Sequence, residues 1–125
     1  MIRVPGSGRF ELRLMDGATN PYLLQAGIIA AGIDGIDNNR NPGKPSFLNM
    51  YAEAHKAKNA KKLPKNLETA LSHLSKSKVM NKAFSKETIN SYVKLRSLDI
   101  KDFKKSKDSK KKGITKWEKL NTLDC

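Results

Sequence analysis

Hydrophobic and polar residues alternate strictly over residues 9–14, which read Arg-Phe-Glu-Leu-Arg-Leu. A period of two is that of a β-strand, so the three apolar side chains share one face. The charged side chains of Arg9, Glu11 and Arg13 then share the opposite face, with neighbours about 7 Å apart along the strand. The pattern predicts a strand that carries a row of two guanidinium groups and one carboxylate.

A helix is expected to begin at Pro21, because Asn20 suits the N-cap and proline is tolerated at the first helical position. Residues 23–31 are apolar on nearly all sides, and Gly27 with several alanines permits close approach of other elements. This is typical of a helix buried between layers. Two further glycines and the polar residues 37–45 are expected to end it in a loop.

Two more helices are expected after Asn66 and Ser85, both of which suit an N-cap. Apolar residues follow Asn66 at i, i+3, i+4 and i+7, which predicts an amphipathic surface helix. Ile89 opens a similar stripe in the other helix. Residues 101–113 are rich in lysine and low in complexity, so we expect them to be frayed or disordered.

These elements indicate an α+β fold with one or two strands and three to four helices. The strand is expected to come from a larger antiparallel sheet, with the apolar helix behind it. We divide the chain into residues 1–100, a basic segment at 101–113 and a tail at 114–125. Only 38% of the residues are hydrophobic and the mean hydropathy is -0.62, which is polar for a self-sufficient globule.

The net charge of +13 favours a nucleic-acid or other polyanionic partner. The first 36 residues hold three arginines and three acidic residues, so the excess comes from residues 37–125 and is densest at residues 104–112. A small basic protein that binds nucleic acid is therefore one hypothesis. We rank it second, because the strongly patterned opening segment plays no part in it.

The only cysteine is Cys125, which excludes an intramolecular disulfide and fits a reducing compartment. No basic and then apolar leader opens the sequence. The longest apolar run, residues 22–36, is too short to span a bilayer. We expect a cytoplasmic protein without a membrane partner.

The row of Arg9, Glu11 and Arg13 has two interpretations. Glu11 could ligate Mg²⁺ while the arginines clamp phosphate or carboxylate groups, since guanidinium binds those anions bidentately. Alternatively, the row is a solvated strand face with ion pairs, which is the commoner case. The residues alone leave both open.

Other candidates for chemistry are weaker. Residues 6–8 (GSG) precede a strand and do not open a helix, so they indicate a turn and not a phosphate loop. His55 and His73 lack further ligands at metal-binding spacing and are expected on the surface. Trp117 is expected to anchor the last segment on apolar surface, and Cys125 has no partner for thiol chemistry.

Four blocks resemble the C-terminal part of the glutamine synthetase catalytic domain in order and spacing. They are residues 3–5 (RVP), 8–14 (GRFELRL), 16–23 (DGATNPYL) and 30–36 (AAGIDGI). A looser similarity extends over the later chain to the eukaryotic-like, long-chain branch of the family, called type III. It is carried by residues 90–96 (NSYVKLR), 117–118 (WE) and 121–125 (NTLDC).

The resemblance implies roles for four residues. Glu11 would ligate Mg²⁺ or Mn²⁺, Arg13 would be the catalytic arginine that contacts glutamate or the phosphoryl group, and Arg3 and Arg9 would face the phosphates of ATP. The reaction implied is transfer of the ATP γ-phosphoryl group to the side-chain carboxylate of glutamate. Ammonia then displaces phosphate from the acyl phosphate, so the product is glutamine.

The resemblance also implies that the other metal ligands, the nucleotide-binding residues and the N-terminal domain of the family lie upstream of this segment. We therefore expect the 125 residues alone to be inactive. Met1 would then be an internal position of a longer gene product. A third hypothesis is a non-catalytic remnant that joins intact glutamine synthetase subunits.

Overall fold

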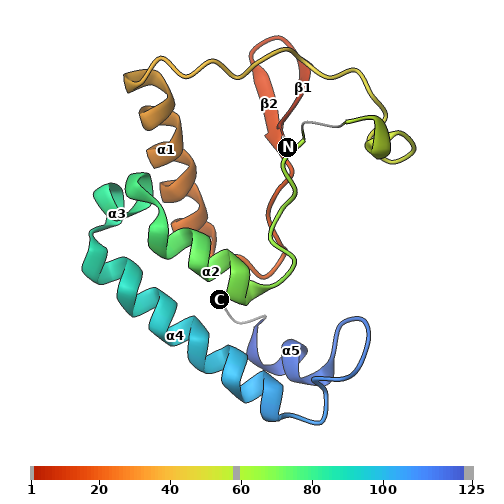
Figure 1. Cartoon of the computed structure of the whole chain (residues 1–125), viewed down its shortest axis with the longest axis vertical. Helices are drawn as coiled ribbons and strands as arrows, with labels where there is room; N and C mark the ends of the chain where they lie inside the picture. The colour runs from red at the N-terminus through yellow and green to blue at the C-terminus, as the bar shows by residue number, and fades with distance from the viewer. Residues whose placement is uncertain (1, 58–59, 123–125) are drawn as a thin grey trace.

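The computed structural model describes residues 2–57 and 60–122 and has an open α+β architecture (Figure 1). The described residues form one hairpin, five α-helices and a short 3₁₀ helix, so the α+β class is confirmed but the expected three to four helices are too few. In chain order the elements are β1 (Ile2–Gly6), β2 (Arg9–Leu12), α1 (Pro21–Asp37), η1 (Ala54–Lys56), α2 (Leu67–Lys76), α3 (Lys78–Phe84), α4 (Lys86–Lys105) and α5 (Lys116–Asn121).

The two strands form an antiparallel hairpin in which Arg3 lies opposite Glu11. The turn is closed by Ser7 and Gly8, as the GSG pattern predicted, and Gly8 has a φ of 72°. A side chain at that φ would be strained, which explains the glycine. The register shifts between Arg3 and Gly6, so β1 contains an irregularity. β2 ends at Leu12 and is two residues shorter than the predicted strand.

Helix α1 begins at Pro21 as predicted. The Asn20 side chain accepts hydrogen bonds from the backbone N–H groups of Tyr22 and Leu23, at 3.1 and 3.0 Å. The helix runs through both glycines that were expected to end it and stops at Asp37. An isolated glycine costs a helix only about 1 kcal/mol, and two such costs do not end the helix before Asp37.

The expected burial of α1 is wrong for this chain. None of its residues is buried, and Ile29, Ile33 and Ile36 are 62%, 53% and 77% exposed. The helix packs on α3 along one side only. A helix that is apolar on all sides is typical of one surrounded by other elements in a complete fold. Among the described residues α1 has only α3 as a packing neighbour, so its other sides stay exposed.

The core lies where α2 packs against α4, with α3 between them in the chain. Leu71 of α2 and Ile89 of α4 are each 5% exposed and are the buried apolar residues of the described chain. Asn66 and Ser85 cap these helices as predicted. Helix α3 was not predicted, because it is only seven residues long and Ser77 both ends α2 and caps α3.

Disorder of residues 101–113 was a wrong expectation, because α4 continues without a break to Lys105 and hydrogen-bonded turns follow. Asp108 orders these turns: its carboxylate pairs with Lys111 at 2.6 Å and accepts from the backbone N–H of Trp117 at 2.8 Å. Trp117 also stacks edge-on against Phe103, with ring centroids 5.3 Å apart. The predicted anchoring role of Trp117 is confirmed.

His55 and His73 are exposed, as expected. Within residues 2–57 and 60–122, no helix combines the length and apolar character that crossing a membrane requires. The expectations for Met1 and Cys125 concern positions outside the described residues.

Replacing Leu71 or Ile89 with alanine should lower the free energy of unfolding by about 2–4 kcal/mol, because each leaves a cavity between α2 and α4. Chemical denaturation followed by far-UV circular dichroism measures the change. Leu120→Ala is the matched control, since Leu120 is 68% exposed. Equal effects of Leu71→Ala and Leu120→Ala would contradict the placement of the core.

Candidate anion-binding site on the hairpin

The hairpin gathers three arginines around one carboxylate. Arg9 and Glu11 lie on one face of β2, Arg13 just after the strand donates to Glu11, and the strand register adds Arg3 from β1. All four residues singled out from the sequence therefore lie together. We call these four residues the arginine cluster.

Each arginine of the cluster donates to Glu11. The Arg9 guanidinium approaches Oε1 at 2.7 Å, and Arg3 reaches both carboxylate oxygens at 3.1 and 3.3 Å. Arg13 donates through Nε and Nη2 to Oε2 at 3.2 and 2.9 Å. Charge-assisted bonds of this kind favour the ionised carboxylate. They lower the pKa of Glu11 from 4.5 to about 2, with the hydrogen bond from Arg9 as the largest cause.

The cluster is open to solvent. The side chains of Arg3, Arg9 and Arg13 are 53%, 69% and 46% exposed, whereas that of Glu11 is 24% exposed. Arg9 also lines a shallow hollow at the tip of the hairpin. Three guanidinium charges against one carboxylate leave a formal excess of two positive charges, and each guanidinium has more donors than Glu11 occupies. The cluster can therefore accept an additional phosphate or carboxylate.

This geometry confirms one part of the sequence interpretation and leaves another as a prediction. The ion pairs expected on a solvated strand face are present. The contact from Arg3 could not be read from the alternation in β2, because it depends on pairing with β1. The role of each arginine toward a substrate remains a prediction.

The cluster does not fit a metal ion in its present arrangement. Both oxygens of Glu11 accept hydrogen bonds from arginines. No group of three or more histidine, cysteine, aspartate or glutamate side chains is positioned to hold a metal within the described part of the chain. Mg²⁺ is reluctant to lose its water and is usually bound through one or two carboxylates together with substrate phosphates. The described residues therefore do not form a metal site by themselves, and the metal role of Glu11 stays a prediction.

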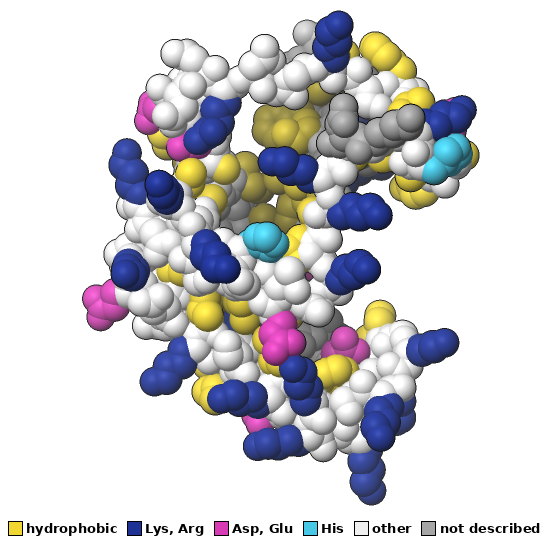
Figure 2. Space-filling model, in the orientation of Figure 1, with side chains coloured by type: hydrophobic (Ala, Val, Ile, Leu, Met, Phe, Trp, Pro, Cys, Tyr) yellow, Lys and Arg dark blue, Asp and Glu magenta, His cyan; other side chains and the backbone are white. Residues whose placement is uncertain are grey.

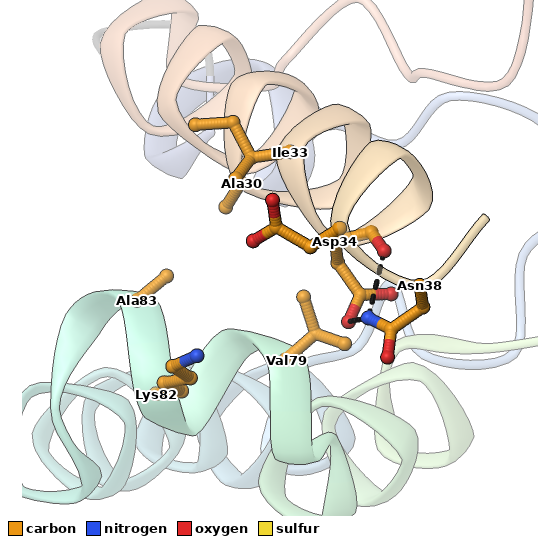
Figure 3. A pocket seen from close by; sticks show the side chains of 8 residues that line it. Ala30, Ile33, Asp34, Asn38, Val79, Lys82 and Ala83 are labelled. Carbon is orange, nitrogen blue, oxygen red and sulfur yellow. Dashed lines mark hydrogen bonds between the residues drawn. The ribbon is translucent and has the colours of Figure 1, made fainter. Parts of the chain in front are cut away.

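A second concavity of about 350 Å³ lies between α1 and α3. Figure 3 shows Ala30 and Ile33 of α1 facing Val79 and Ala83 of α3 across it. Asp34 lies at its edge, and its carboxylate is held by Asn38 at 3.0 Å and by Arg40 at 2.7 Å. Asp34 thus links the C-terminal end of α1 to the residues that follow it. The sequence could not predict this cleft, because α3 was not predicted.

Residues 1–117 match the sequence profile of the family described as "Glutamine synthetase, catalytic domain". The chain belongs to the glutamine synthetase family. It is 45% identical over 124 residues to a glutamine synthetase of Rhizobium leguminosarum bv. phaseoli and 43% identical to one of Rhizobium meliloti (strain 1021). It is also 38% identical over 127 residues to a glutamate–methylamine ligase of Methyloversatilis universalis.

These alignments cover 99% of the chain but only 27% of each relative. The chain thus spans about a quarter of the length of the glutamine synthetases that it matches. No solved structure gives a significant match. The arginine cluster lies within the matched part of the catalytic domain, so the family assignment and the candidate site concern the same residues.

The low pKa of Glu11 is testable by NMR titration of its side-chain carboxylate. We expect a midpoint near 2 in the folded chain, against 4.5 for an ordinary glutamate. Because the folded pKa is the lower one, this carboxylate stabilises the hairpin fully above pH 4.5 and loses that contribution as the pH falls toward 2.

Arg9→Gln should raise the pKa of Glu11 more than Arg3→Gln or Arg13→Gln does, because the Arg9 hydrogen bond is the largest cause of the shift. Arg40→Gln serves as the control, since Arg40 pairs with Asp34. A pKa of Glu11 near 4.5 in the wild-type chain would show that the arginines do not converge on it.

Proposed function

We propose that this chain supplies the arginine-bearing C-terminal part of a glutamine synthetase catalytic domain, in an enzyme that makes glutamine from glutamate, ammonia and ATP. The observation that carries the proposal is the arginine cluster, found on one hairpin face of a chain that belongs to the family. Three guanidinium groups at one place suit a reaction whose substrates, ATP and glutamate, and whose acyl phosphate intermediate carry phosphate and carboxylate groups.

The proposed steps put different demands on the arginines. The γ-phosphoryl group of ATP moves to the side-chain carboxylate of glutamate, and ammonia then displaces phosphate from the acyl phosphate. Phosphoryl transfer depends on positioning and on stabilising negative charge. In the proposal Arg13 holds the glutamate or the phosphoryl group in transfer, and Arg3 and Arg9 hold the nucleotide phosphates.

Glu11 keeps these arginines together when no substrate is bound. Without Glu11, the three guanidinium groups would repel one another and their side chains would move apart. They would also repel an added cation. The ATP-dependent reaction of the family implies Mg²⁺ or Mn²⁺, but the described donors do not assemble a site for either. Glu11 could take part in one only with carboxylates from the rest of a catalytic domain.

Exposed apolar surface supports the need for that remainder. Phe10 on the back of the hairpin is 64% exposed, and Tyr22, Ile29 and Ile36 on α1 are 81%, 62% and 77% exposed. Apolar patches of this kind mark surfaces that a partner covers. The partner we infer is the upstream part of a glutamine synthetase catalytic domain, because the chain spans only 27% of its relatives. Alone, the 125 residues should be inactive.

Two finer assignments belong to the same proposal. We propose that the chain comes from the eukaryotic-like, long-chain branch of the family, and the support is the similarity of residues 90–96, 117–118 and 121–125 to the type III pattern. A single cysteine is compatible with the reducing cytoplasm, where we place the protein. Ammonia is preferred to methylamine as the amine substrate, because the two Rhizobium glutamine synthetases are more similar to the chain than the glutamate–methylamine ligase is.

Complementation tests the proposal. The chain should be co-expressed with a glutamine synthetase from Rhizobium leguminosarum bv. phaseoli that lacks the aligned C-terminal segment. We expect no glutamine from either piece alone and ATP-dependent glutamine formation when both are present. Arg13→Gln should reduce the restored rate by at least about 100-fold, the usual loss when one stabilising donor is removed.

Arg40→Gln is the matched control for this experiment, because it removes an arginine that lies outside the cluster. Methylamine in place of ammonia compares the two amine substrates directly. Co-purification of the two pieces without any turnover would favour the non-catalytic remnant. Turnover by the 125-residue chain alone would contradict the need for an upstream part.

A further inference from the structure

The lysine-rich end of the chain is ordered and is not used by the proposed catalytic role. Residues 101–119 contain nine lysines and three acidic residues, a net charge of +6. They form the last turn of α4, the turns after it and the first part of α5. The contact between Phe103 and Trp117 holds α5 against the end of α4. We call this unit, residues 101–119, the basic end.

The acidic groups of the basic end are mostly turned inward. The side chain of Asp108 is 13% exposed. Its carboxylate forms an ion pair with Lys111 and accepts a hydrogen bond from the backbone N–H of Trp117. Glu118 completes the capping box of α5 by accepting from the backbone N–H and the hydroxyl of Thr115, at 2.7 and 2.8 Å. Two of the three carboxylates, those of Asp108 and Glu118, are thus engaged in hydrogen bonds within the basic end. Little negative charge remains on the surface to offset the lysines.

The lysines of the basic end face solvent. All nine are exposed, and the pairs formed by Lys104 with Glu68 and Lys111 with Asp108 leave their own side chains 60% and 63% exposed. Figure 2 shows lysine and arginine side chains projecting along the lower edge of the molecule, around the end of α4 and α5. Seven lysines form no salt bridge with any described residue: Lys101, Lys105, Lys107, Lys110, Lys112, Lys116 and Lys119.

We propose that the basic end binds the phosphate backbone of double-stranded nucleic acid and does not distinguish between base sequences. Ammonium groups are point charges on flexible stems, which suits a repeated phosphate charge better than one planar anion. Phosphates neutralised by lysine release counterions, and this release drives association.

The aromatic residues favour a duplex over a single strand. Single-strand binders stack bases on exposed rings. The rings of Phe103 and Trp117 pack on each other and are only partly accessible. The basic end therefore offers charge without a stacking platform, and the backbone of a duplex is the complementary partner.

The test measures binding of the full 125-residue chain to a fluorescent DNA duplex of mixed sequence, over a series of salt concentrations. We expect affinity to fall about 100-fold between about 50 and about 200 mM salt, the loss for four phosphate contacts. A variant with Lys105→Gln, Lys107→Gln, Lys110→Gln and Lys112→Gln should lose most of this binding and most of its salt dependence.

A charge-matched control separates the basic end from the overall charge. Four substitutions, Lys76→Gln, Lys78→Gln, Lys82→Gln and Lys86→Gln, remove the same charge around α3 and should leave both affinity and salt slope nearly unchanged. Trp117 fluorescence reports whether each variant keeps the fold of the basic end. If the fourfold variant loses that signal, Lys107→Gln with Lys112→Gln should still weaken binding by about tenfold.

Three results would overturn the proposal. The first is no detectable binding of wild-type chain to the duplex near 50 mM salt. The second is an equal loss of affinity in the control variant, which would assign binding to net charge alone. The third is tighter binding to vesicles containing anionic lipid, or to an acidic peptide of equal charge, than to the duplex.

Discussion

The ion-pair network around Glu11 is the interaction on which the candidate site depends. Three guanidinium groups on a two-stranded hairpin repel one another, and the carboxylate between them makes the arrangement possible. Arg9 on β2 and Arg13 just after it reach Glu11 from two positions away in the sequence, and Arg3 reaches it because the register places it directly opposite. Exposed ion pairs are individually weak. The arrangement is stable as a group of three ion pairs to one carboxylate.

The two faces of the hairpin are in opposite situations. The charged side chains of one face form ion pairs with one another. The apolar side chains of the other face are not buried: Ile2, Val4 and Phe10 are 62%, 71% and 64% exposed. A lone two-stranded hairpin is marginally stable in water, and the described helices pack on one another more than on these strands. Together with the apolar surface of α1, this indicates that the folded state of the chain depends on covering surfaces, as its 27% coverage of full-length relatives would lead one to expect.

Local signals in the sequence predicted much of the fold. The alternation at residues 9–14 identified the charged face of β2, and Asn20, Asn66 and Ser85 each cap the helix they were expected to begin. Features set by tertiary contact were missed. The Arg3 contact requires pairing with β1, and the order at residues 106–113 requires Asp108 to meet Trp117. Burial of α1 was predicted because its residues are apolar on nearly all sides, which indicates packing neighbours on all sides. The described residues supply such a neighbour on one side only.

The central claim is that Glu11 orders the three arginines, and side-chain NMR of the guanidinium groups tests it most directly. In the wild-type chain the Nε–H resonance of Arg13 should exchange slowly with water and show a hydrogen-bonded shift, because this group donates to Glu11 at 3.2 Å. In Glu11→Gln the resonance should move to the position of a free arginine and exchange fast. An unchanged Arg13 resonance in that variant would show that the carboxylate does not hold the cluster together.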